Sequence, residues 1–252
     1  PLGFLSLSLS RLIYGNRLPA GYNNFGMKTE STMTEHTRHP LSRQELRENI
    51  IEAAVGLFAE QGIKGVTMDD IAASFGISKR TLYEVFADKE SLLLECVRKG
   101  QEENELFLQD VLATSGNVLE VILKCYQRSI EKFHATNKKF FDDIKKYPRA
   151  YEMIKNGNNR SSEDTINFLR QGVEQGIFRS DVNFAIVNLL VREQLNLLMG
   201  TDVCTEYPFL EVYESIMFTF LRGISTERGA AELECFIREY RKNQHPASGN
   251  PL

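Results

Sequence analysis

Hydrophobic and polar residues alternate with helical periodicity along most of this chain, so helices are predicted from about residue 42 to residue 243. The clearest pattern is Thr67–Phe86, which predicts two short helices joined at Gly76. Thr67 and Ser78 stand at N-cap positions, and Asp70 stands where a capping box needs its acidic partner. The residues expected to share the small core between these helices are Ile71, Phe75, Ile77, Leu82 and Val85.

Longer helices are predicted on both sides of this pair. One begins at Ser42, whose capping box is completed by Glu45, and ends at Gly62. The other begins after Asp88 and should link the first domain to the rest of the chain. The first of these packs over the two short helices, so the sequence predicts a three-helix N-terminal domain.

The second short helix exposes Lys79, Arg80, Thr81 and Tyr83. A capped helix start that carries basic side chains offers groups to phosphates and to base edges. An ordinary helical hairpin with a solvated basic face would show the same residues. The caps, apolar contacts and glycine coincide at the spacing of a DNA-binding helix-turn-helix, so we favour that interpretation.

The region of about residues 43–98 resembles the DNA-binding domain of the tetracycline-repressor (TetR) family of bacterial transcription regulators. Two positions depart from the family pattern: Arg80 replaces a frequent glycine, and Val85 replaces a frequent histidine or tyrosine. These two departures affect which operator sequence is recognised and leave the mode of DNA binding unchanged. The matching residues are Phe58, Gly62, Thr67, Ile71, Ala72, Gly76, Ser78, Thr81, Leu82, Tyr83, Phe86 and Lys89.

The resemblance implies an all-α chain with a helix-turn-helix domain and a C-terminal helical domain for ligand binding and dimerisation. We place a disordered N-terminal extension at 1–40, the DNA-binding domain at 41–87, the second domain at 88–243 and a disordered tail at 244–252. Base-edge contacts are predicted for Lys79, Arg80 and Thr81. Phosphate contacts are predicted for Thr67, Ser78, Tyr83 and Lys89, together with Arg43 or Arg47.

Two late segments, Phe184–Met199 and Phe209–Ile224, are apolar on nearly all sides. They would suit a homodimer interface, in which each helix pairs with its copy in a four-helix bundle, and they would equally suit the core of a monomer. We favour the homodimer because a helix-turn-helix normally reads a palindromic double-stranded operator with two copies. Just before the first of these two segments, Gly176 is expected to end a helix and Asp181 to cap the next.

A small-molecule effector that releases the DNA is implied by the resemblance. Core packing is an alternative role for each candidate residue of its pocket, and for any single candidate it is the interpretation we favour. The alternative is a DNA-binding protein without such an effector, regulated by a protein partner. The pocket candidates are Phe107, Tyr126, Phe133, Phe140, Tyr147, Tyr151 and Gln194.

The remaining sequence adds little chemistry. The net charge of −4 is mildly unfavourable for nucleic acid, but the basic residues gather near the N-terminus. No catalytic motif, metal-ligand spacing or cofactor fingerprint is present, which disfavours an enzyme carrying an attached helix-turn-helix. The adjacent Asp142 and Asp143 are expected on a solvated face. The scattered cysteines favour the reducing cytoplasm, and no apolar stretch is long enough for a membrane span.

Overall fold

The computed structural model describes residues 42–156, 162–200 and 206–244. Within these ranges the chain is all-α, as predicted, and the only β-type pairing is an isolated antiparallel bridge between Phe178 and Ser225. The predicted extension at 1–40 lies outside the described residues. So does the predicted tail, except for Gln244, which ends the last helix.

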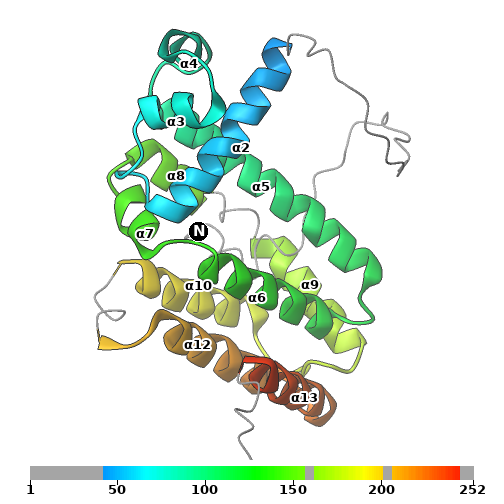
Figure 1. Cartoon of the computed structure of the whole chain (residues 1–252). Helices are drawn as coiled ribbons and strands as arrows, with labels where there is room; N and C mark the ends of the chain where they lie inside the picture. Colours follow the sequence, from blue (N-terminus) through cyan, green and yellow to red (C-terminus); the bar gives the residue numbers. More distant parts are fainter. Residues whose placement is uncertain (1–41, 157–161, 201–205, 245–252) are drawn as a thin grey trace, which may run out of the picture.

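An N-terminal unit of three helices occupies one end of the molecule (Figure 1, top). It consists of α2 (Arg43–Gln61), α3 (Met68–Phe75) and α4 (Lys79–Val85). The predicted capping boxes are confirmed: Thr67 Oγ1 accepts from the Asp70 N–H at 3.1 Å, and the Asp70 carboxylate accepts from the Thr67 N–H at 2.7 Å. Gly76 has a φ of +70°, a left-handed conformation that side chains disfavour. The turn between α3 and α4 therefore depends on this glycine.

The predicted small core is also confirmed. Ile71 and Leu82 are fully buried, and Phe75, Ile77 and Val85 are partly buried against the same cluster. Burial of this apolar surface fixes α4 on α3 and leaves the opposite side of α4 exposed.

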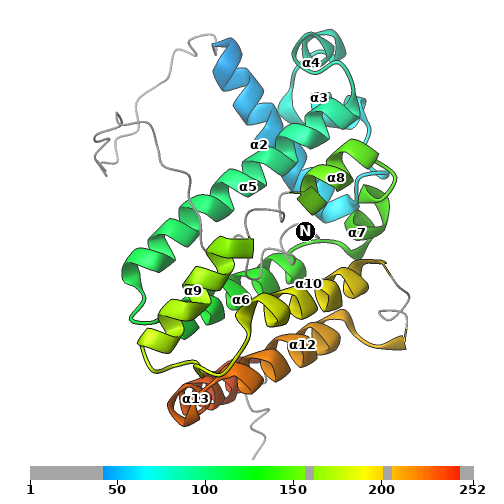
Figure 2. The same cartoon turned by 180° about the vertical axis from the view of Figure 1, so that it is seen from behind.

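The helix α5 (Lys89–Thr114) runs from the N-terminal unit into the rest of the molecule. Figures 1 and 2 show α10, α12 and α13 at the end opposite α4. A continuous buried core extends from Ile50 in α2 to Ile237 in α13. The other helices are α6 (Val118–His134), α7 (Lys138–Ile144), α8 (Pro148–Asn156), α9 (Ser162–Glu174), α10 (Phe184–Gly200), α12 (Phe209–Ile224) and α13 (Glu227–Gln244).

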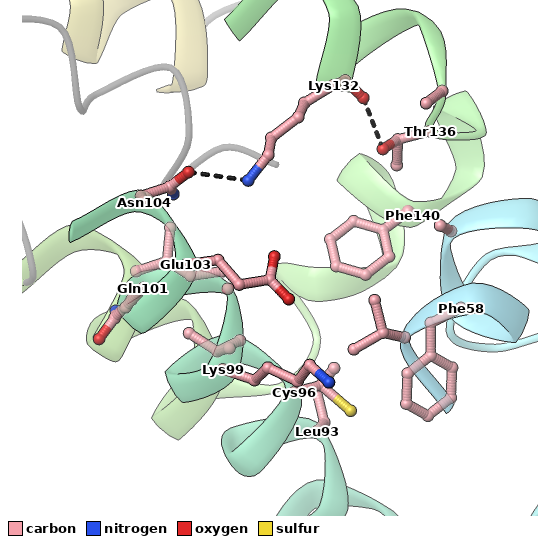
Figure 3. A pocket seen from close by; sticks show the side chains of 16 residues that line it. Phe58, Leu93, Cys96, Lys99, Gln101, Glu103, Asn104, Lys132, Thr136 and Phe140 are labelled. Carbon is pink, nitrogen blue, oxygen red and sulfur yellow. Dashed lines mark hydrogen bonds between the residues drawn. The ribbon is translucent and has the colours of Figure 1, made fainter. Parts of the chain in front are cut away.

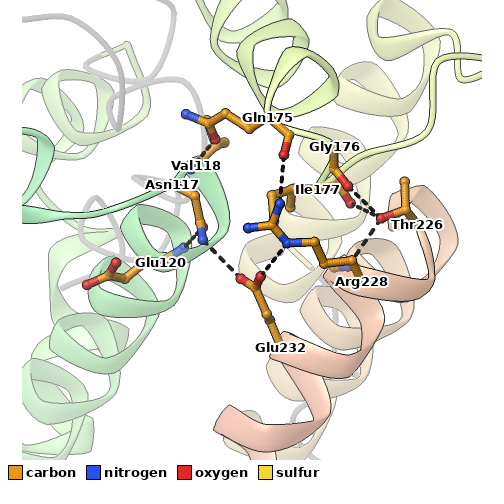
Figure 4. Close-up of polar contacts among 10 residues, drawn as sticks. Asn117, Val118, Glu120, Gln175, Gly176, Ile177, Thr226, Arg228 and Glu232 are labelled. Atoms are coloured by element: carbon orange, nitrogen blue, oxygen red, sulfur yellow. Dashed lines mark hydrogen bonds and ion pairs between the residues drawn. The ribbon is translucent and has the colours of Figure 1, made fainter.

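Polar contacts join the start of α6, the end of α9 and the start of α13 (Figure 4). The Val118 N–H donates to Gln175 Oε1 at 2.9 Å, and Asn117 Nδ2 donates to Glu232 Oε2 at 2.9 Å. Arg228 donates to Glu232 at 3.1 Å and to the Gln175 carbonyl at 3.3 Å. Helix-end groups that lack partners within their own helices are thereby satisfied by neighbouring segments.

The predicted helix stop at Gly176 is confirmed by its φ of +70°, but the expectation that Asp181 caps the next helix is wrong. The carboxylate of Asp181 pairs instead with Arg179, 2.6 Å away. Helix α10 begins two residues later than that cap would require, and the side chain of Asn183 accepts from the Ala185 and Ile186 N–H groups. Asp181 does not cap α10, because Arg179 engages its carboxylate.

The N-terminal unit is attached to α7 by hydrogen bonds at the end of α2. The Asn137 N–H donates to the Ala59 carbonyl at 2.7 Å, and Asn137 Nδ2 donates to the Glu60 carbonyl at 2.9 Å. The Lys64 N–H donates to Asp143 Oδ2 at 2.7 Å. Asp143 is buried, so its expected place on a solvated face was wrong: the sequence spacing did not reveal that a loop amide 79 residues away needs an acceptor.

Candidate nucleic-acid interface

The helix α4 lies at the outer end of the molecule (Figure 1), and its basic residues Lys79 and Arg80 are exposed. Arg80 has a side-chain exposure of 89 % and, among the residues that the structure describes, pairs only with Glu84, one turn later on the same helix, at 3.0 Å. Lys79 is exposed and pairs with Asp69 of α3 at 2.8 Å. Exposed pairs of this kind contribute little to stability, so DNA can replace their partners at small cost.

Ser78, Thr81 and Tyr83 surround this basic pair. Ser78 Oγ accepts from the Thr81 N–H at 3.1 Å, which is the predicted N-cap, and the two hydroxyls lie 2.8 Å apart. Thr81 is half-buried, whereas Tyr83 is exposed. The predicted base-edge and phosphate residues of α4 are therefore together on one outer surface.

The two predicted α2 arginines have different surroundings. Arg43 is exposed and donates to the Glu84 carbonyl at 3.3 Å, at the end of α4. Arg47 is 3.1 Å from Glu95 and lies over the Phe86 ring, 4.6 Å from its centroid. The guanidinium of Arg47 is thus held by Glu95 of α5 and by Phe86, whereas Arg43 contacts the end of α4.

Lys89 is the first residue of α5, and its ammonium lies over the Phe58 ring, 5.9 Å from the centroid. Partial burial lowers the pKa of Lys89, while the nearby Asp143 and Asp70 carboxylates act in the opposite direction. Asp70 also accepts from the hydroxyl of Thr67, so Thr67 has its side chain engaged in the cap of α3. Asp70 therefore acts on both predicted phosphate residues: it accepts a hydrogen bond from Thr67, and its charge acts on Lys89.

Most of the predicted pocket residues pack against other side chains. Tyr126 stacks on Tyr213 with the ring centroids 5.6 Å apart, and its hydroxyl donates to Glu214 at 3.0 Å. Phe133 stacks on Phe209 at 4.5 Å. The Tyr126 pKa is raised, mainly because the phenol is buried.

The other candidates are dispersed. Phe107 lies beneath the Arg128 guanidinium at 4.2 Å, Tyr147 and Tyr151 are partly buried against the core, and Gln194 is exposed on α10. Only Phe140 among the seven lines the cavity described next.

A cavity of about 200 Å³ lies where the N-terminal unit meets the rest of the molecule (Figure 3). Helix α2 contributes Val55, Phe58 and Ala59 to its lining, and α5 contributes a longer set that includes Cys96 and Asn104. No local sequence pattern predicts this cavity, because its walls come from α2, α5, the α6–α7 region and α8.

Thiol chemistry and metal binding find no support within the described residues. Burial raises the pKa of both Cys96 and Cys125 to about 12, so neither thiol ionises readily. Cys235 is exposed, and Cys204 lies outside the described residues. The described part of the chain contains no metal-binding group of three or more His, Cys, Asp or Glu residues. Nor does any helix there have the length and apolar character needed to cross a membrane.

Comparisons with known proteins agree with this geometry. The family described as "Bacterial regulatory proteins, tetR family" matches residues 50–96. The HTH-type transcriptional repressor KstR2 of Mycobacterium tuberculosis is 29% identical over 153 residues, which cover 58% of this chain and 76% of that protein. IcaR of Staphylococcus aureus, a negative transcriptional regulator of the biofilm operon icaADBC, is 28% identical over 111 residues, covering 44% and 54% of the two chains.

Solved structures share the fold. A TetR-family regulator from Marinobacter aquaeolei has a TM-score of 0.56 at 16% identity, with coverage of 77% of this chain and 98% of that one. A TetR-family regulator from Cytophaga hutchinsonii has a TM-score of 0.56 at 14% identity, with coverage of 75% and 100%. At these identities the likeness concerns the fold alone.

The exposed basic α4, fixed on α3 at a glycine turn, defines the class of helix-turn-helix transcription regulators. The match to residues 50–96 and the similarity to KstR2 support a tetR-family regulator.

Proposed function

We propose that this protein is a sequence-specific, homodimeric transcriptional repressor that a small molecule releases from a palindromic operator. The observation that carries the DNA-binding part is the outward presentation of Arg80, Lys79 and Tyr83 on a buried scaffold. KstR2 and IcaR, to which the chain is similar, are by name a repressor and a negative regulator. A bacterial repressor acts on chromosomal DNA, so we place this protein in the cytoplasm.

The interface is proposed to lie on α10 and α12, which run side by side at the end opposite α4 (Figures 1 and 2). Three large apolar side chains, Ile186, Leu189 and Leu190, are exposed on α10. Exposed apolar side chains that share one helix face are typical of association sites. Pairing of two subunits there would place two α4 helices in successive major grooves, about 34–36 Å apart.

Selection of bound sequences from a random pool of duplex DNA tests this proposal. We expect enrichment of an inverted repeat whose half-sites are about one helical turn apart. Enrichment of a single, unrepeated half-site would contradict dimeric recognition, and the absence of any enriched sequence would contradict sequence-specific binding.

A further inference from the structure

One end of the junction cavity is polar (Figure 3). Lys132 Nζ donates to Asn104 Oδ1 at 2.7 Å. The other end of the same amide, Asn104 Nδ2, is buried and has no acceptor among the described residues. The Thr136 hydroxyl donates to the Lys132 carbonyl at 2.8 Å. A buried N–H group without an acceptor is uncommon in folded proteins, and it indicates that a hydrogen-bond acceptor is missing from this place.

The charges that line the cavity favour an anion. Lys132 and Lys99 are its two lining cations, and Glu103 is its one lining carboxylate. Lys99 is also 3.7 Å from Glu52, whereas Glu103 is exposed. An anionic acceptor at Asn104 would therefore lie beside the Lys132 ammonium.

Apart from Gln101, whose side-chain amide donates to the Met153 carbonyl, the rest of the lining is apolar and comes from several helices. Phe58 and Val55 of α2 lie across from Leu93 of α5, and Phe140 and Ile154 complete the wall. A dry cavity of about 150 Å³ accommodates benzene, so about 200 Å³ suits an apolar body of roughly six to eight carbons.

We propose that this cavity binds a monocarboxylate with such a body, whose carboxylate accepts hydrogen bonds from Asn104 Nδ2 and Lys132 Nζ. The site shares Phe140 with the predicted pocket but none of the other six predicted residues, and one of its walls is made by α2 of the N-terminal unit.

The effect of this ligand on operator affinity rests on the proposed function of the protein as a DNA-binding repressor. Helix α2 carries α3 and α4, and a molecule held between α2 and α5 contacts both sides of the junction. A ligand that prefers one orientation of the N-terminal unit changes the operator affinity by the same factor by which the operator changes the ligand affinity. We assign it the role of weakening operator binding.

Calorimetric titration of the full chain with octanoate, 1-octanol and octylamine tests the site. We expect one octanoate per chain, with the alcohol and the amine bound at least about tenfold more weakly because they lack the anion. Equal binding of octanol, or an octylamine preference, would overturn the carboxylate assignment, and no binding of octanoate would overturn the site.

Substitutions of residues that line the cavity test whether octanoate binds there. Lys132→Met and Asn104→Leu each remove one donor, and Ala59→Leu fills the cavity from α2; each is expected to reduce octanoate affinity at least about tenfold. Lys124→Met is the matched control, because Lys124 lies on the same helix, pairs with Glu120 at 2.8 Å and does not line the cavity. Thermal unfolding checks each variant, and if Lys132→Met does not fold, the other two decide. Unchanged octanoate affinity in the folded cavity variants would contradict the location.

Repeating the operator measurement with octanoate separates the two proposals. If octanoate weakens operator binding by the original protein and has no such effect on the Ala59→Leu variant, both the site and its role are supported. Octanoate binding without any effect on operator affinity overturns the role, while a chain that binds octanoate and no DNA overturns the proposed function alone.

Discussion

The Phe58 ring lies between the Lys89 ammonium, 5.9 Å from its centroid, and the junction cavity, which Phe58 lines with its side chain. Lys89 begins α5 at the end of the molecule where α4 is exposed. One aromatic side chain therefore has contact both with a predicted phosphate-binding lysine and with the proposed ligand site. This arrangement gives a physical connection between cavity occupancy and DNA contact, and the following experiments test its parts.

Arg80→Ala is expected to weaken operator binding by about 1–3 kcal/mol and to relax selectivity at one base position. Arg80 is almost fully exposed and its pair with Glu84 is a surface contact, so the thermal unfolding midpoint should remain nearly unchanged. Binding titrations against operators substituted one base pair at a time measure both effects. A uniform loss across all these operators would show that Arg80 contacts only phosphate.

Lys89→Met is expected to weaken binding to all sequences alike and to reduce the slope of log affinity against log salt by about 1. Methionine retains the apolar contact with Phe58 and removes the charge, so the folded state should persist. Titrations at several salt concentrations make the measurement, and Arg80→Ala serves as the base-contact comparison. An unchanged salt slope would mean that Lys89 does not reach phosphate.

Leu190→Glu is expected to convert the protein to a monomer and to reduce operator affinity by about 10²–10⁴-fold, because the two half-sites are then bound independently. Leu106→Glu is the matched control: Leu106 is 67% exposed, against 55% for Leu190, but lies on α5. Light scattering after size-exclusion chromatography gives the oligomeric state. A Leu190→Glu protein that stays dimeric would place the interface elsewhere.

Gly76→Ala is expected to destabilise the protein by about 1 kcal/mol, because alanine is strained at a φ of +70° although no heavy atom lies within 4 Å of its Cβ position. Gly56→Ala is the control with the opposite sign: Gly56 lies inside α2, has an equally open Cβ position and should stabilise by roughly 0.5–1 kcal/mol. Chemical denaturation measures both. Equal effects would contradict the conformational explanation.

Octanoate affinity is expected to be constant between about pH 6 and 7, where the ligand carboxylate is ionised, and to fall as the pH rises through about 8. Burial lowers the pKa of Lys132 to about 8, with Arg128 of α6 acting in the same direction and Glu103 of α5 opposing it, so the ammonium is lost above that value. The pH dependence of folding stability has the opposite sign to that of octanoate affinity. The unfolded chain binds the extra proton between about pH 8 and the ordinary lysine pKa of about 10.4, so the Lys132 contribution to stability increases over that range. Calorimetry from pH 6 to 9.5 measures the first effect, and Lys132→Met should remove the pH dependence.

Local rules predicted the N-terminal unit well. The caps at Ser42, Thr67 and Ser78 and the left-handed Gly76 depend on residues within four positions of one another. Asp181 failed as a cap because Arg179 competes for its carboxylate, and Asp143 was misplaced because its partner amide belongs to Lys64. Both errors arose where a side chain had a choice of partners.

The sequence by itself determined the all-α fold, the boundaries of the helix-turn-helix and the outward basic side of α4, because helical periodicity and capping are local properties of the chain. Tertiary structure alone decided that Arg47 is held by Glu95, that Tyr126 belongs to an aromatic core, and that Asn104 and Lys132 meet at a cavity beside α2. The two residues of each pair are far apart in the sequence: 28 positions for Asn104 and Lys132, 48 for Arg47 and Glu95, and 87 for Tyr126 and Tyr213. Only the packing of helices on one another brings such residues together.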